Sequence, residues 1–110
     1  MPSSRRPVLP ALTFAALGAL ALAGCAGVPV QEMSDARQAV RAAQEAGGAR
    51  YAPETMAEAE KLLKSAKSNL GKGEYRAARE EAEQARAQAM AARGQAEAAR
   101  ADEKAGGRNP

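Results

Sequence analysis

Histidine and tryptophan are absent from this chain of 110 residues, and cysteine occurs once. Histidine is the side chain best suited to proton transfer near neutral pH, so acid–base catalysis lacks its commonest agent. Histidine and cysteine are also usual ligands of transition metals, which argues against such a site. Thr55, Ser65 and Ser68 have no evident base beside them. The sequence therefore predicts no catalytic residue, no metal site and no cofactor, and we expect no enzyme.

Two other groups of polar residues carry no evident chemistry. Gly71-Lys72-Gly73 is too short for a phosphate-binding loop, which needs a longer glycine-rich stretch ending in lysine and serine or threonine. Glu80, Glu81 and Glu83 would point in different directions around a helix. That spacing favours surface salt bridges over a cation site.

Large apolar side chains are few, and alanine dominates the chain. Phe14, Tyr51 and Tyr75 are its aromatic residues. Beyond residue 34 the other large apolar side chains are Val40, Met56, Leu62, Leu63, Leu70 and Met90. Because the free energy gained on burial grows with apolar area, the core contributes little stability. We expect a marginally stable monomer or a chain that gains stability from a partner.

Charged residues are missing from positions 7–30, directly after Arg5 and Arg6. A basic start, an apolar stretch and small residues before a cleavage point are typical of a secretory signal peptide. The apolar stretch ends in residues that resemble a bacterial lipobox: Leu22, Ala23, Gly24 and Cys25. In a lipobox the cysteine thiol receives a diacylglyceryl group and the preceding peptide is removed. We predict that residues 1–24 are cleaved and that Cys25 carries covalent acyl lipid, including palmitate.

The same segment allows other interpretations. A lone cysteine can be a small buried side chain or an unpaired thiol that awaits another chain. An uncleaved membrane helix needs about 20 apolar residues. Here it would have to include Gly24, Gly27 and Pro29, which are poor helix formers. Residues 4–9 also resemble a degraded twin-arginine export signal, but paired arginines are ordinary in any leader, and general secretion is favoured.

Cleavage would leave the chain close to neutral. The full sequence has 16 Lys+Arg against 13 Asp+Glu, and removal of the two residues Arg5 and Arg6 leaves 14 against 13. The basic isoelectric point of the full chain is therefore weak support for a nucleic-acid partner. We expect none.

A tether is predicted at residues 25–33, followed by a helical domain at residues 34–104. Ser34-Asp35 is typical of a helix start, and the first helix is expected to run to Ala46. Its inward positions are Met33, Ala36, Val40 and Ala43. Gly47-Gly48 is expected to end it, because glycine readily takes the left-handed conformation of a helix exit.

Pro53 suits the first turn of a second helix, where its missing N–H is not needed. The apolar positions of this helix are Ala52, Met56, Ala59, Leu63, Ala66 and Leu70. Gly71-Lys72-Gly73 separates it from a third helix, expected over residues 74–104. The last residues, 105–110, are predicted to form a flexible tail.

The third helix has the most regular pattern in the sequence. Spacings of three and four relate Tyr75, Ala78, Ala82, Ala85, Ala89, Ala92, Ala96 and Ala99. This alanine seam indicates close packing on a neighbouring helix, and the short glycine turn favours the second helix as an antiparallel partner. The third helix would be about 46 Å long and the second about 27 Å. Either the first helix or a separate molecule should then cover the overhang.

A polar stripe lies beside the alanine seam and contains Arg79, Glu83, Arg86, Met90, Arg93, Glu97 and Arg100. Its arginines are a candidate interaction face for anionic envelope material such as lipid phosphate or wall polymer. The plainer interpretation is a solvated face with ion pairs Arg79–Glu83, Arg93–Glu97 and Glu97–Arg100, each worth about 0.2–0.5 kcal/mol. We favour the solvated face.

Several short motifs place the chain near a known family. Tyr51-Ala52-Pro53-Glu54, Gly73-Glu74-Tyr75 and Glu83-Gln84-Ala85 resemble Ala-rich helical bacterial lipoproteins that are catalogued only as a domain of unknown function. The resemblance covers roughly residues 33–100 and implies no catalytic residue. In some members of that family a domain similar to the wall-binding part of outer membrane protein A follows. Gly73-Glu74-Tyr75 with Ala78 and Ala85 also resembles the second helix of a tetratricopeptide repeat, but one hairpin does not make a solenoid.

The sequence therefore predicts an all-α lipoprotein, built as a small antiparallel helical hairpin or a three-helix bundle behind a cleaved signal peptide. We expect a binding or spacer module that is anchored by lipid and faces the periplasm. Ala26 after the cysteine, by resemblance to proteobacterial lipoproteins, favours the outer membrane over the inner one. The expected partners are the membrane, an envelope protein or the cell wall. The alternative is a structural coiled-coil lipoprotein that assembles with itself.

Overall fold

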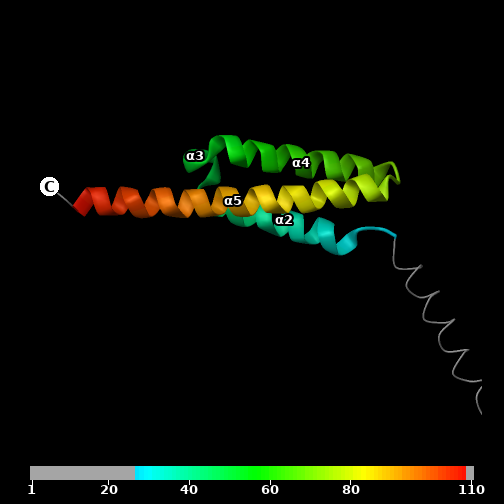
Figure 1. The fold of residues 1–110 in the computed structure, drawn as a ribbon, viewed down its shortest axis with the longest axis horizontal. Helices are drawn as coiled ribbons and strands as arrows, with labels where there is room; N and C mark the ends of the chain where they lie inside the picture. The colour runs from blue at the N-terminus through cyan, green and yellow to red at the C-terminus, as the bar shows by residue number, and fades with distance from the viewer. Residues whose placement is uncertain (1–26, 109–110) are drawn as a thin grey trace, which may run out of the picture.

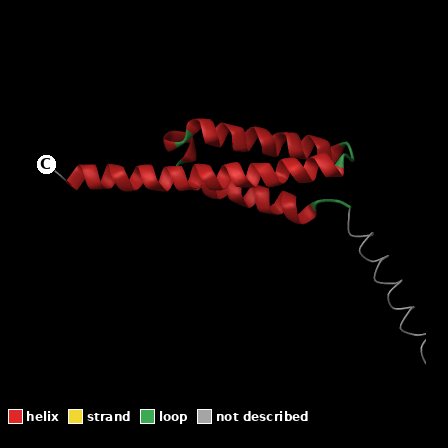
Figure 2. Cartoon of the chain, viewed as in Figure 1, coloured by secondary structure: helices red, strands yellow, loops and turns green. Residues whose placement is uncertain are grey.

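The structure is a computed structural model that describes residues 27–108. These residues form four helices, α2 (Val30–Glu45), α3 (Gly48–Tyr51), α4 (Pro53–Gly71) and α5 (Tyr75–Arg108), and the described part of the chain contains no strand (Figures 1 and 2). The predicted all-α fold is confirmed. The predicted signal peptide and lipidated Cys25 lie outside the described residues.

The three long helices pack side by side, with α5 between α2 and α4 (Figure 1). Glu81, near the start of α5, accepts hydrogen bonds from Ser65 and Asn69 near the end of α4, so these two helices are antiparallel. Contacts of α5 with Glu32 and Ala46, at the two ends of α2, run in the same order along both helices. Helix α2 is therefore parallel to α5. Of the two predicted architectures, the structure is the three-helix bundle.

The first helix starts earlier than predicted. It begins at Val30, and the backbone N–H of Met33 donates to the carbonyl oxygen of Pro29 at 3.1 Å. Pro29 and Met33 are among the largest fully buried side chains, so packing holds this first turn without a side-chain cap. Ser34 is not the N-cap; it lies within the helix, where its hydroxyl accepts a hydrogen bond from Gln38. The expected tether thus ends before Val30.

The glycine pair Gly47-Gly48 ends the first helix, as predicted. Gly47 has φ of 95°, in the left-handed region where glycine is favoured. The chain then forms the four-residue helix α3, which the sequence analysis did not predict, and Pro53 opens α4. Gly48 is buried against Met56, and a Cβ atom added there would lie 2.7 Å from the Met56 sulfur. The path between α2 and α4 therefore depends on a glycine at position 48.

A second glycine turn joins α4 to α5. Gly73 has φ of 79°, and its N–H donates to the carbonyl oxygen of Leu70 at 3.1 Å. The N–H of Glu74 reaches back to the carbonyl oxygen of Asn69 at 2.9 Å. These two bonds satisfy carbonyl groups at the end of α4 and reverse the chain, as the sequence predicts.

The core consists mainly of the predicted small side chains. Six members of the alanine seam are completely buried on α5: Ala78, Ala82, Ala85, Ala89, Ala92 and Ala96. The larger buried apolar side chains are Met33 and Val40 on α2 and Met56 and Leu63 on α4. Two end members of the predicted seam differ, because Tyr75 is 38% exposed and Ala99 is only half-buried. The seam ends there because the neighbouring helices end.

Helix α5 runs beyond the rest of the bundle and ends at Arg108 rather than at Lys104. Its 34 residues correspond to about 51 Å, against about 28 Å for the 19 residues of α4. The first helix does not cover the overhang, because α2 lies beside the same part of α5 as α4 does (Figure 1). Residues 101–107 are all exposed, so backbone hydrogen bonds rather than packing carry the helix through the expected tail.

Candidate functional surface

The four arginines of the candidate interaction face, Arg79, Arg86, Arg93 and Arg100, follow one another at intervals of seven along α5. This interval keeps them on one side of the helix. The side is the one that faces α2, because Arg79 and Arg100 both bond to residues of the α2 segment. The structure therefore brings the predicted face together. Its two outer arginines, Arg79 and Arg100, bond to the α2 segment, and its two inner arginines are Arg86 and Arg93.

The outer arginines hold the two ends of α2. The guanidinium of Arg79 donates to the Gly27 carbonyl oxygen at 2.9 Å and to the carboxylate of Glu32 at 3.3 Å. Arg100 donates to the carbonyl oxygen of Ala46, just after α2, at 3.1 Å. A cation at this position satisfies a free carbonyl and interacts favourably with the negative end of the helix dipole. Both arginines therefore stabilise the fold.

These contacts change the ion pairs that were predicted along the stripe. Arg79 pairs with Glu32 instead of Glu83, and Arg100 bonds to backbone instead of Glu97. The pair Arg93–Glu97 is confirmed, with a nitrogen–oxygen distance of 3.3 Å. The other two pairs, which spacing along one helix predicts, are wrong. The actual partners lie about fifty residues away in the chain and become neighbours only through the bundle.

The inner arginines border a shallow groove between α2 and α5. Arg86, Met90 and Arg93 line its α5 side, and its α2 side is formed by Asp35, Gln38, Ala39 and Ala42. Met90 is 57% exposed, so a large apolar side chain is open to solvent between two guanidinium groups. The groove offers apolar contact through Met90 and the two alanines, and charged contact through Arg86, Arg93 and Asp35. It suits docking rather than chemistry.

On the opposite side of α5, polar side chains form hydrogen bonds with side chains of α4. Ser65 and Asn69 donate to the two carboxylate oxygens of Glu81, and Thr55 donates to Gln95 at 3.0 Å. The hydroxyl groups considered for catalysis at positions 55 and 65 are thus used in helix packing. Glu80, next to Glu81, pairs with Arg76 at 3.6 Å, which agrees with the predicted salt-bridge role.

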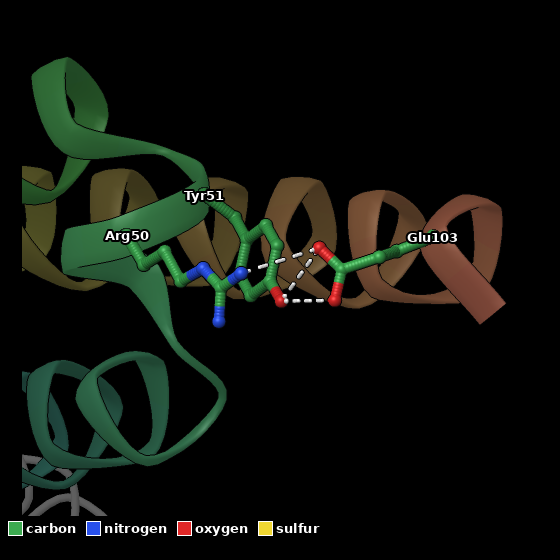
Figure 3. A network of polar contacts seen from close by, with 3 residues as sticks. All are labelled: Arg50, Tyr51 and Glu103. Carbon is green, nitrogen blue, oxygen red and sulfur yellow. Dashed lines mark hydrogen bonds and ion pairs between the residues drawn. The ribbon is translucent and has the colours of Figure 1, made fainter. Parts of the chain in front are cut away.

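A polar cluster that the sequence analysis missed joins α3 to the overhanging part of α5 (Figure 3). The hydroxyl of Tyr51 lies 3.1 Å from both carboxylate oxygens of Glu103, and Arg50 lies 3.5 Å from the same carboxylate. The guanidinium carbon of Arg50 also lies 4.8 Å from the centre of the Tyr51 ring. Because α3 was not predicted, nothing in the sequence pattern pointed to this cluster.

Three further observations concern residues 27–108. They contain no group of three or more His, Cys, Asp or Glu side chains placed to hold a metal ion. No buried side-chain nitrogen or oxygen among them lacks a hydrogen-bond partner. No helix in this range is both long and apolar enough to cross a membrane.

The described residues thus form a small three-helix domain in which a long C-terminal helix buries an alanine seam. Residues 31–108 match the family model described as a domain of unknown function (DUF4398), and the chain belongs to that family. The match confirms the predicted resemblance and extends slightly beyond the residues that suggested it. Searches among curated proteins and among solved structures gave no match.

Proposed function

We propose that this protein is a lipid-anchored periplasmic lipoprotein of the outer membrane that acts as a binding or spacer module in the cell envelope. The lipid is attached to Cys25 after removal of residues 1–24. The protein is not an enzyme and binds no cofactor. Its helical domain carries the function by reaching away from the membrane and presenting a docking surface.

The observation that carries this proposal is the parallel arrangement of α2 and α5. Val30 is five positions after Cys25, so the start of α2 lies within about 18 Å of the anchor. Arg79 lies beside Glu32 near the start of α2, and α5 continues from there to Arg108, a further length of about 44 Å. The end of α5 is therefore the end farthest from the anchored segment. This is the geometry of a short spacer.

The groove between α2 and α5 supports the binding part of the proposal. It lies midway along the domain, where Arg86 and Arg93 lie on either side of Met90 and Asp35 lines the α2 side. Arg93 also pairs with Glu97, so Arg86 is the main cationic group offered to a ligand. Anionic envelope material or an acidic helix of an envelope protein would complement this group. The outer arginines are already bonded within the fold and are not assigned to the ligand.

The alternative, self-assembly as a coiled coil, gains less support from the geometry. The alanine seam that such an assembly would use is buried inside one chain, where Ala82, Ala85 and Ala89 have no exposed surface. Self-assembly would have to use another surface, such as the exposed last turns of α5.

The test of the anchor is Cys25→Ser in the native host. The serine oxygen does not replace the thiol in lipidation, so we expect the variant to keep its leader and carry no acyl mass. The wild-type protein should fractionate with the outer membrane and carry two or three acyl chains on Cys25, which together hold far more firmly than one. Wild-type protein in the soluble fraction without acyl mass would refute the proposal. Recovery in the inner membrane would refute only the sorting.

A further inference from the structure

Exposed apolar side chains gather at one end of the bundle. Among the described residues, the large apolar side chains with substantial exposure are Val28, Val30, Tyr75 and Met90, at 51%, 70%, 38% and 57%. Met90 lies in the groove between α2 and α5. The other three lie where α2 and α5 both begin. Scattered apolar residues are normal on a protein surface, but a cluster at one end requires an explanation.

The contacts of Arg79 show that these three side chains belong to the same end. Arg79 bonds to the Gly27 carbonyl oxygen at 2.9 Å, so the residues before α2 lie against the first turns of α5. Tyr75 lies one turn before Arg79, about 6 Å nearer the end of the bundle. Figure 1 shows the start of α2 and the α4–α5 turn at the same end of the molecule.

The segment before α2 is held with its valines outward. Pro29 is fully buried, whereas Val28 and Val30 on either side of it are largely exposed. The backbone N–H of Val30 donates to the carbonyl oxygen of Val28 at 2.9 Å, and the adjoining Gly27 is bonded to Arg79. The two valines are therefore fixed on the surface by their neighbours.

The charged residues around this end are of both signs. Lys72 and Arg76 are exposed there, and so are Glu74 and Glu80, which with Arg76 and Tyr75 line a shallow hollow. Arg76 and Glu80 form an ion pair at 3.6 Å. A partner of strong single charge gains little from such a surface. The apolar side chains, with a tyrosine that carries a polar hydroxyl, instead match the boundary between lipid head groups and acyl chains.

We propose that this end of the bundle is a membrane-contact surface, in which Val28, Val30 and Tyr75 enter the head-group region of the bilayer. The proposal rests on the lipid anchor at Cys25, which is three residues before Val28 and keeps Val28 within about 11 Å of the lipidated cysteine. A surface held so close binds with a high effective concentration, so three apolar side chains suffice. The bundle then stands on its end with the tip of α5 pointing away from the membrane.

The absence of tryptophan from the chain makes a direct test available. Tyr75→Trp places one fluorescent reporter at the proposed surface, and Met90→Trp places a matched reporter at an exposed position about 22 Å farther along α5. Each full-length, acylated variant is reconstituted in phosphatidylethanolamine vesicles that carry a spin-labelled lipid quencher near the glycerol. Intact mass confirms the acyl chains on Cys25, and circular dichroism confirms the helical fold.

We expect the lipid quencher to reduce the emission of Tyr75→Trp severalfold more than that of Met90→Trp. Adding Val28→Asp and Val30→Asp to the Tyr75→Trp variant should remove most of this difference. Replacing a third of the lipid with anionic phosphatidylglycerol should change it little, because the surrounding charges are balanced.

Equal quenching of the two acylated reporters would overturn the membrane-contact surface and leave the anchor intact. A blue-shifted Tyr75→Trp emission that the lipid quencher does not reduce would also overturn it, because a second copy or a partner protein would then cover this end. An N-terminus without acyl mass would overturn the anchor and this proposal together.

Discussion

Gly48 is the residue where the smallest side chain matters most. It begins α3 directly against α4, and a Cβ atom at this position would lie 2.7 Å from the Met56 sulfur and 2.9 Å from the Ala43 carbonyl oxygen. The sulfur belongs to a flexible side chain, but the carbonyl belongs to the backbone of α2. An added methyl group must therefore move a helix and not merely a rotamer.

We predict that Gly48→Ala destabilises the domain by about 1–3 kcal/mol, the usual cost of overpacking. The matched control is Gly94→Ala on α5, where nothing lies within 4 Å of an added Cβ atom. This control should stabilise the domain by about 1 kcal/mol, because alanine is the better helix former. Urea denaturation followed by circular dichroism measures both changes. Equal effects of the same sign would contradict the close approach at Gly48.

Ala85 tests the packing of the alanine seam at a single position. Its side chain is completely buried between helices, whereas Ala87, two residues later, is exposed. We predict that Ala85→Leu lowers the melting temperature, since a larger side chain must separate the helices at a cost of about 1–3 kcal/mol. Ala87→Leu should leave the melting temperature nearly unchanged. A higher melting temperature for Ala85→Leu that rises with protein concentration would instead mean that leucine creates an oligomer.

At the scale of elements, contacts with α5 hold both ends of helix α2. Its start has no side-chain cap, and Arg79 closes it through Gly27 and Glu32. The Arg79 and Glu32 side chains are 30% and 31% exposed, so their charges are partly withdrawn from water. Breaking one partner of such a pair costs more than breaking a pair on the open surface.

We therefore predict that Arg79→Gln destabilises the domain by about 1–2 kcal/mol and speeds hydrogen exchange in the first turns of α2. Arg76→Gln is the control, because the Arg76 side chain is 92% exposed and its pair with Glu80 is a surface pair. That change should cost less than about 0.5 kcal/mol. If the two variants lose equal stability and α2 exchanges at the wild-type rate, Arg79 does not hold the helix.

The elements also show where sequence reasoning succeeds and where it fails. Spacing along one helix predicted the buried alanines of α5, because a heptad pattern is local and repeats several times. A capping preference instead predicts that the first helix starts at Ser34. That start is wrong although Met33 is correctly assigned an inward position, because the burial of Pro29 extends the helix back to Val30. Sequence reasoning also missed α3, whose four residues are too few to show a period.

The candidate surface was less predictable than the fold for a related reason. The interval of seven correctly placed Arg79 and Arg100 on one side of α5, but their partners belong to another helix. Those partners follow from the parallel course of α2, and this course is set by how α3 leads the chain back into α4. The spacing of residues within one helix does not indicate the path that the chain takes between helices.

At the scale of the whole molecule, the most continuous apolar surface, the alanine seam of α5, is buried inside the bundle. Helix α5 contacts α2 and α4 along the alanine seam, and the part that extends beyond them has only exposed residues at positions 101–107. Among residues 27–108, few large apolar side chains are exposed apart from Met90 and the cluster at the end where α2 and α5 begin. Stable interfaces between proteins usually bury more than about 1,000 Å².

We therefore predict that the bundle without residues 1–25 is a monomer. The measurement is sedimentation velocity of a version that lacks residues 1–25, over a hundredfold range of concentration, after circular dichroism has confirmed its helices. A single species with the mass of one chain and the high friction of an elongated particle is the expected result, because α5 extends past its neighbours (Figure 1). A dimer that persists at the lowest concentration would favour the self-assembling coiled coil. Met90→Glu would then locate the interface, since the dimer should dissociate only if the groove between α2 and α5 forms it.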